Sequence, residues 1–193
     1  MLMTLAFFTL ENQLMNLFLW HRPIYYYTIF QYFQSNLLTI NISKTSYIIF
    51  KAKNKTIPPF THLRINNQQI EEKREEKYLG LILDSDMAWI PHIDKVRTNL
   101  SSLIGMLRNI VRSIPRRVQF TIYNSLVKPH LLYLIEIWGC TAKSKLVKLQ
   151  TTQNKLVKLL FHYPYLTSTD KIYTETKIMT IRQLYTYTTC LLI

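Results

Sequence analysis

The residues that could act on phosphate groups in this sequence are cations rather than carboxylates. The 193 residues include 24 Lys and Arg but only 11 Asp and Glu, which gives a formal net charge of +13. The sequence has no Asp-Asp pair, and its first aspartate is Asp84. Because two-metal phosphoryl transfer needs carboxylates that hold two ions about 4 Å apart, the sequence predicts no metal site and no catalytic residue of this kind.

The basic residues are concentrated in one part of the chain. The segment 95–169 contains twelve Lys or Arg and a single acidic residue, Glu136. A basic block on an apolar scaffold predicts a polyanionic partner, most often a nucleic acid. A membrane surface is the rival interpretation, and a basic surface without any partner is the simplest one. The residues expected to contact phosphates are Lys95, Arg97, Arg108, Arg112, Arg116, Arg117, Lys155 and Lys158.

Several other classes of protein are disfavoured by the composition. Only three glycines are present and no glycine-rich phosphate loop occurs, which argues against a dinucleotide or P-loop enzyme. No small-molecule substrate is expected. Cys140 and Cys190 are far apart, so neither a zinc site nor a disulfide framework is predicted. The apolar segment 1–20 lacks a basic leader and is interrupted by polar residues. We therefore expect no signal peptide, no transmembrane helix and an intracellular location, nuclear or cytoplasmic.

Hydrophobic spacing predicts that strands lie before residue 86 and helices after it, an α+β fold. The first part is expected to contain a helix at 25–37, strands at 38–42 and 46–50, a hairpin at 63–71 and a strong strand at 77–85. The second part is expected to contain helices at 91–110, 116–127, 129–139 and 145–161, and a helical tail at 180–193. We predict a domain boundary between 86 and 87.

Four short segments occur in an order and spacing that resemble the downstream half of reverse transcriptases from non-LTR retrotransposons of the LINE type, particularly the jockey-like group. They are Leu37 to Thr45 followed by the strand 47–50; Tyr78 to Asp84 followed by Trp89 and His92; Lys128-Pro129 followed by Ile137 to Gly139; and Leu149-Gln150 followed by Gln153 to Lys155. The resemblance covers about 25–185.

The resemblance implies roles for particular residues. Lys44 would lie on the triphosphate side of the palm, although as a lone residue it reads equally well as a solvated turn lysine. Tyr78, Leu79 and Gly80 would form a structure like the primer grip, with a plain core strand as the alternative. The basic helices would correspond to a thumb that binds the RNA/DNA template-primer duplex by its phosphates.

The resemblance also implies what the chain lacks. In the family, catalytic aspartates hold Mg²⁺, and they come from an upstream residue and a Tyr-Ala-Asp-Asp turn. We therefore expect residues 1–86 to be a truncated palm remnant and 87–193 a basic, helical, thumb-like region. The chain would be a polymerase fragment that is inactive alone and holds no cofactor. The alternative is a non-catalytic helical RNA- or DNA-binding module.

The first five residues suggest one further hypothesis. Met1 to Leu5 would result from reading codons for Tyr-Ala-Asp-Asp-Thr one base out of frame. On this hypothesis the chain starts inside a frame-shifted catalytic segment of a decayed element. Asp-Asp codons in the neighbouring frame of the nucleotide sequence would support the hypothesis, and their absence would remove it.

Overall fold

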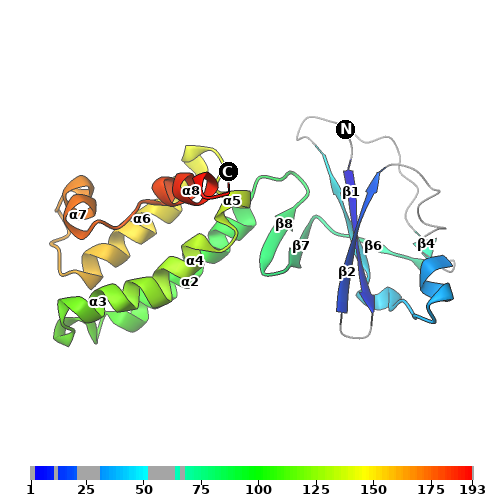
Figure 1. Ribbon diagram of the computed structural model, residues 1–193, viewed down its shortest axis with the longest axis horizontal. Coiled ribbons are helices and arrows are strands. Elements are labelled where there is room, and N and C mark those ends of the chain that lie inside the picture. Colours follow the sequence, from blue (N-terminus) through cyan, green and yellow to red (C-terminus); the bar gives the residue numbers. More distant parts are fainter. Residues whose placement is uncertain (1–2, 11–12, 21–30, 52–63, 66–67, 193) are drawn as a thin grey trace. The chain divides into compact units, whose positions relative to one another are not determined.

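The computed structural model describes residues 3–10, 13–20, 31–51, 64–65 and 68–192, with side chains from residue 31 onward except that of Arg112. The chain divides into two compact units, 1–88 and 89–193. Each unit is described by itself (Figure 1). The first unit contains the strands and the second is helical, so the predicted α+β class is confirmed.

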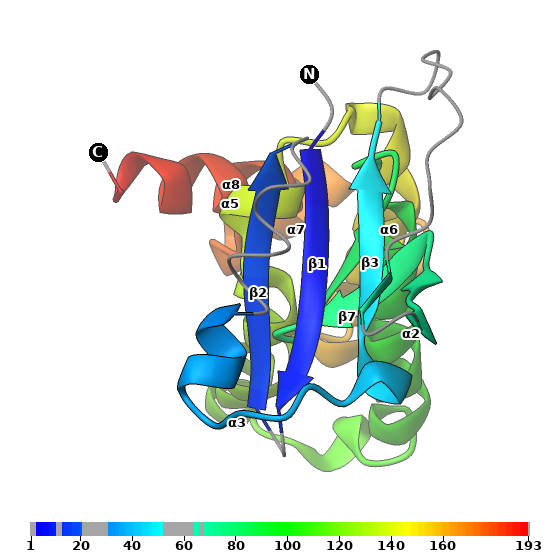
Figure 2. The same ribbon diagram turned by 90° about the vertical axis from the view of Figure 1, so that its right-hand side faces the viewer.

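The first unit is built on a sheet with the strand order β2-β1-β3-β6. Its strands are β1 (Met3–Leu10), β2 (Gln13–Trp20), β3 (Ser46–Phe50) and β6 (Glu71–Glu72). Strand β1 lies between β2 and β3 and is antiparallel to both (Figure 2). Met3 lies opposite Trp20 and Phe50, and β3 and β6 are parallel. The two N-terminal strands were not anticipated from the sequence.

The predicted strand at 46–50 is confirmed as β3, whose five residues are all buried. The predicted strand at 38–42 is wrong, because this segment leads into a 3-10 turn, η1 (Ile42–Lys44). Asn41 organises the turn: its side-chain Oδ1 accepts a hydrogen bond from Ser43 (2.7 Å), and its carbonyl accepts one from Thr45 (2.8 Å). Such local bonds compete with strand pairing. Of the helix predicted at 25–37, residues 31–35 are helical and 25–30 lie outside the described residues.

The segment predicted as one strand at 77–85 is a hairpin, and that prediction is corrected here. Strands β7 (Glu75–Tyr78) and β8 (Leu81–Asp84) pair antiparallel, with Tyr78 opposite Leu81. Leu79 (φ 45°) and Gly80 (φ 83°) form the two-residue connection, and two positive φ values are what tight hairpin turns require. The hairpin predicted at 63–71 is present as β4 (Arg64–Ile65) and β5 (Gln68–Gln69).

The second unit consists of helices, and its two longest lie side by side (Figure 1). The elements are α2 (Ile90–Leu107), η2 (Val111–Ser113), α3 (Arg116–Ile122), the π-helical η3 (Tyr123–Val127), α4 (Lys128–Leu132), α5 (Ile135–Trp138), α6 (Lys143–Leu160), α7 (Thr169–Thr176) and α8 (Ile181–Cys190). The predicted helices at 91–110, 116–127 and 145–161 correspond to α2, α3 with η3, and α6. The helix predicted at 129–139 is broken at Leu134 (φ 51°), and α7 was not anticipated.

The core of the helical unit is made by the inner faces of these helices. Leu100, Leu131, Ile135 and Leu149 are fully buried, as is Trp138, whose indole N–H donates to the carbonyl of Tyr133 (2.9 Å). None of the helices in the described part of the chain has the length and apolarity needed to cross a membrane.

Candidate nucleic-acid interface

Positive charge is concentrated in the helical unit. Residues 89–193 contain 15 Lys and Arg and four Asp and Glu, so this unit carries eleven of the thirteen net charges. Of the residues predicted to contact phosphates, Lys95, Arg108, Arg116, Arg117 and Lys155 are exposed, Arg97 and Lys158 are half-buried, and the side chain of Arg112 lies outside the described residues. The inner faces of the same helices form the core, which leaves the cations on the outer faces.

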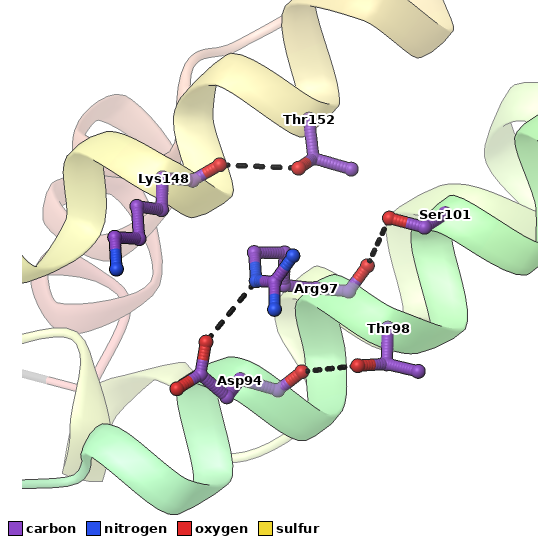
Figure 3. A network of polar contacts seen from close by, with 6 residues as sticks. All are labelled: Asp94, Arg97, Thr98, Ser101, Lys148 and Thr152. Carbon is purple, nitrogen blue, oxygen red and sulfur yellow. Dashed lines mark hydrogen bonds and ion pairs between the residues drawn. The ribbon is translucent and has the colours of Figure 1, made fainter.

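Arg97 of α2 is the best-positioned of these cations. Its Nε donates to Oδ1 of Asp94, 3.1 Å away, and its side chain remains 39% exposed. Figure 3 shows the guanidinium between α2 and α6, on the side from which Lys148 of α6 projects. The ion pair engages Nε and fixes the orientation of the guanidinium plane. A guanidinium has two further nitrogens, which can bind a phosphate in a bidentate manner.

Lys148 was missed among the predicted phosphate contacts, although a signal was present. It is exposed and precedes Lys155 by seven residues, so both lie on the same side of α6. Its neighbours across the two helices are hydroxyl residues (Figure 3). Thr98 and Ser101 of α2 and Thr152 of α6 each donate to the carbonyl four residues earlier, at 2.8, 2.9 and 3.1 Å. Thr98 and Ser101 are exposed, whereas Thr152 is buried.

Two other predicted cations lie elsewhere, at the connection between α6 and α7. Nζ of Lys158 donates to the carbonyl of Tyr165 (2.6 Å) and lies 5.6 Å from the centre of its ring. Arg116 is close to the hydroxyl of Tyr163, which donates to Glu175 (2.7 Å). The hydrogen bond to Glu175 raises the pKa of Tyr163, and Arg116 opposes that shift. The structure thus does not bring the predicted cations into a single cluster, because Lys158 and Arg116 contact the connection between α6 and α7.

The segment that begins at Leu149-Gln150 forms a polar network inside the unit. Gln153 is fully buried, and its amide donates to the hydroxyl of Tyr123 (3.0 Å) and to the carbonyl of Met179 (2.9 Å). Gln150 donates to Gln153 (2.9 Å) and to the hydroxyl of Tyr173 (2.8 Å). Burial raises the pKa of Tyr123 to about 12 and also raises the pKa of Tyr173. The network connects α6 to η3, to α7 and to the segment before α8.

The candidate residues of the first unit lie on its surface. Lys44 is exposed at the end of η1, immediately before β3. In the β7–β8 hairpin, Tyr78 is half-buried and packs against the cluster formed by Ile48 and Phe50. Leu79 is 66% exposed, and Gly80 beside it is also exposed. The tip of the hairpin is therefore the part that a ligand could approach.

Two carboxylates of the β7–β8 hairpin already have partners within the fold. Asp84 is buried, and its Oδ2 accepts the backbone N–H of Ala88 (2.8 Å), which closes the turn after β8. Oε2 of Glu76 accepts hydrogen bonds from Lys73 (2.7 Å) and Ser46 (3.1 Å). Within the described ranges, no three side chains of His, Cys, Asp or Glu come together as metal ligands would.

Comparison with known proteins identifies relatives but no structural counterpart. No family model matches the chain, and no solved structure does. A probable RNA-directed DNA polymerase from transposon X-element of Drosophila melanogaster is 26% identical over 74% of the chain. The RNA-directed DNA polymerase from mobile element jockey is 29% identical over 73% of the chain in Drosophila funebris, and 24% identical over 79% in Drosophila melanogaster.

The match is confined to a small part of each relative. The aligned residues make up 15–17% of these three polymerases, so the chain spans about one sixth of their length. A probable RNA-directed DNA polymerase from transposon BS gives the same picture, with 26% identity over 76% of the chain. The chain is thus a homologue of the RNA-directed DNA polymerases of jockey-like, non-LTR retrotransposons, as the order of its four sequence segments predicted.

Proposed function

We propose that the chain is a segment of a retrotransposon reverse transcriptase that holds an RNA/DNA template-primer duplex by its phosphates and does not itself join nucleotides. The observation that carries this proposal is the charge of the helical unit, 15 basic against four acidic side chains, on a scaffold with a complete apolar core. Contacts to phosphates supply most of the sequence-independent affinity for nucleic acids. The homology to RNA-directed DNA polymerases supports the choice of partner.

The α2–α6 surface, defined here by Arg97, Lys148 and Lys155, is the proposed centre of this contact. Asp94 holds Arg97 in one orientation, so less side-chain freedom is lost when a phosphate binds. Lys148 and Lys155 are separated by about 10 Å along the axis of α6. This spacing corresponds to about three base steps of a duplex at 3.4 Å each. The surface can therefore follow one strand over several phosphates.

In the first unit we assign supporting roles by resemblance. Lys44 would offset charge on the triphosphate side of the palm, and its exposure at the end of η1 is compatible with this role. The backbone at Leu79 and Gly80 would approach the primer end, because a hairpin tip without a side chain at Gly80 permits close contact. Tyr78 would support the hairpin from behind, through its packing against Ile48 and Phe50.

Catalysis is assigned to residues outside this chain. In the intact family enzyme Mg²⁺ would stabilise the charge of the reacting phosphates. Two carboxylates of the grip-like hairpin itself are instead used within the fold, since Asp84 closes a turn and Glu76 accepts from Lys73 and Ser46. We therefore expect purified chain supplied with Mg²⁺, template-primer and deoxynucleotides to extend no primer. Extension of the primer would show that carboxylates of this chain do assemble a metal site.

A salt titration tests the binding proposal. The affinity of the chain for a fluorescent RNA–DNA hybrid is measured by anisotropy at several salt concentrations, and the logarithm of the binding constant should fall linearly with that of the salt. Lys148→Gln should reduce the magnitude of this slope by about 0.9, the value for one lost phosphate contact. Lys171→Gln removes the same charge from α7, where Lys171 pairs with Glu175, and serves as the matched control.

Two results would contradict the proposal. One is an affinity that does not depend on salt, which would show that phosphates are not the groups recognised. The other is an equal change of slope in Lys148→Gln and Lys171→Gln, which would indicate a diffuse charge effect rather than a defined surface. Both positions are exposed, so neither substitution should affect folding.

A further inference from the structure

An open groove of about 590 Å³ runs along α7 and α8, apart from the α2–α6 surface. The residues used in the argument are Tyr173 and Lys177 from α7 and its end, Ile178 and Met179 from the connection, and Arg182 and Tyr187 from α8. Its lining includes two cations and two tyrosines but no carboxylate. This combination suits an anionic ligand that also has flat, apolar faces.

The wall of the groove is anchored to the core. The hydroxyl of Tyr173 donates to Asn154 of α6 (2.6 Å), and the carbonyl of Met179 accepts from the buried amide of Gln153 (2.9 Å). Ile178, between them, is buried. Because these contacts hold the connection between α7 and α8 in place, the groove does not have to be formed when a ligand binds.

The positions of the two cations, Lys177 and Arg182, are set by the end of α7 and by an aromatic ring, respectively. Lys177 is exposed and follows α7 with φ 54°, a left-handed conformation that ends the helix. The guanidinium carbon of Arg182 lies 5.7 Å from the centre of the Tyr185 ring, in a cation–π contact that limits its freedom. Both side chains remain exposed and available to phosphates.

Several amides at the start of α8 already have partners within the fold. The N–H of Ile181 donates to Gln150 (3.0 Å), and the N–H of Gln183 donates to the hydroxyl of Thr180 (3.3 Å) in a capping box. An anion in the groove would thus be held by the side chains of Lys177 and Arg182 rather than by the end of the helix. The expected contacts can therefore be removed one at a time by substituting these side chains.

Tyr187 distinguishes this groove from a plain phosphate site. Its side chain is 51% exposed and lies five residues beyond Arg182, about 7.5 Å along the helix axis. An exposed ring next to cations is the arrangement on which unpaired bases stack while their phosphates are neutralised. We infer that the α7–α8 groove binds a single-stranded segment of nucleic acid, with a base on Tyr187 and phosphates on Lys177 and Arg182.

We predict that a duplex and a single strand bind to different residues of the chain. A duplex keeps its bases stacked inside, so it has no face to offer Tyr187, whereas an unpaired strand does. The inference uses none of the residues of the α2–α6 surface and can fail while the proposed duplex binding holds, or hold while that binding fails.

The test compares two probes on the full chain, a fluorescent thymidine dodecamer and an RNA–DNA hybrid of the same length. Tyr187→Leu should weaken binding of the dodecamer about tenfold, as expected for one lost stacking contact, with the slope against salt unchanged. Tyr187→Phe should retain the affinity. Arg182→Gln should weaken binding and reduce the magnitude of the salt slope by about 0.7, the value for one phosphate contact of a single strand. Hybrid affinity should stay within about twofold in all three variants.

Lys171→Gln is again the matched control, because it removes one charge from α7 outside the groove. The inference is overturned if Tyr187→Leu and Arg182→Gln bind the dodecamer as the parent chain does, or if Lys171→Gln loses as much affinity as Arg182→Gln. It is also overturned if the groove variants change only self-association in analytical ultracentrifugation, because the groove would then hold a second copy of the chain.

Discussion

Removal of the Gln153 side-chain amide should strongly destabilise the helical unit. Gln153 is fully buried, and its amide nitrogen serves two acceptors, the hydroxyl of Tyr123 at 3.0 Å and the carbonyl of Met179 at 2.9 Å. Gln153→Leu preserves the volume approximately but leaves both acceptors without this donor. A buried polar group that loses its partner costs about 1–3 kcal/mol. The expected loss is therefore about 4 kcal/mol, a large part of the 5–15 kcal/mol that is typical for a domain.

The same contacts allow a double-mutant cycle. Tyr123→Phe removes one of the two acceptors, so the combination with Gln153→Leu should be less destabilised than the sum of the single changes by about 1–3 kcal/mol. Thr151→Ala on the exposed side of α6 is the control, since Thr151 bonds only to its own helix, and it should change the stability by less than about 0.5 kcal/mol.

Urea unfolding followed by tryptophan fluorescence measures these differences. Trp89 and Trp138 are both buried in the helical unit, so a Trp20→Phe background confines the signal to this unit. Additive losses in the double variant would refute the assignment of Tyr123 as a partner of Gln153. A loss of less than about 1 kcal/mol in Gln153→Leu would refute the buried network itself.

Three further changes follow from the described contacts. Burial raises the pKa of Tyr123 from 10 in the unfolded chain to about 12, so the neutral hydroxyl stabilises the fold fully below pH 10. That contribution of up to about 3 kcal/mol should be lost as the pH rises from 10 to 12, and urea midpoints should show a smaller loss in Tyr123→Phe. Gly139→Ala should cost about 1–3 kcal/mol in the same assay, because an added Cβ would lie 2.5 Å from the carbonyl oxygen of Ile135 and 2.6 Å from the ring of Tyr185. Leu79→Asn should stabilise the β7–β8 hairpin by roughly 0.5–1 kcal/mol, seen as slower amide hydrogen exchange, since Asn tolerates the left-handed conformation that Leu79 adopts at φ 45°.

The spacing of hydrophobic residues predicted the long helices well, because this spacing shows which face of a single helix is buried. The spacing of Leu146, Leu149, Gln153 and Leu156 placed Gln153 on the inner face of α6, where the structure has it. The partners of Gln153 could not be predicted in the same way. They lie 30 and 26 residues away, and only tertiary packing brings them to α6.

The turn elements were harder to predict because their residues are not typical turn formers. Leu79-Gly80 connects a tight hairpin with a leucine at a position that usually holds Asn, Asp or Gly, so the segment reads as one strand. Leu134 likewise has φ 51° and divides α4 from α5 without any sequence signal. At Gly139 the predicted helix end is present, but its φ of −71° needs no glycine. The residue is small because the carbonyl of Ile135 and the ring of Tyr185 in α8 both lie close to it.

The sequence segments that carry the resemblance are mostly structural in this chain, and this bears on where function should be sought. Gly139 permits a close approach, Gln150 and Gln153 form a buried network, and Leu79-Gly80 forms a turn. Shared segments of this kind are stronger evidence that two proteins have the same fold than that they have the same functional site. On α6, however, the two kinds of residue alternate: Gln153 faces inward while Lys148 and Lys155 face outward. Because the network helps the buried leucines of α6 to fix the rotation of this helix about its axis, it also contributes to the direction of the two lysines. Gln153→Leu should therefore weaken duplex binding even under conditions in which the variant stays folded.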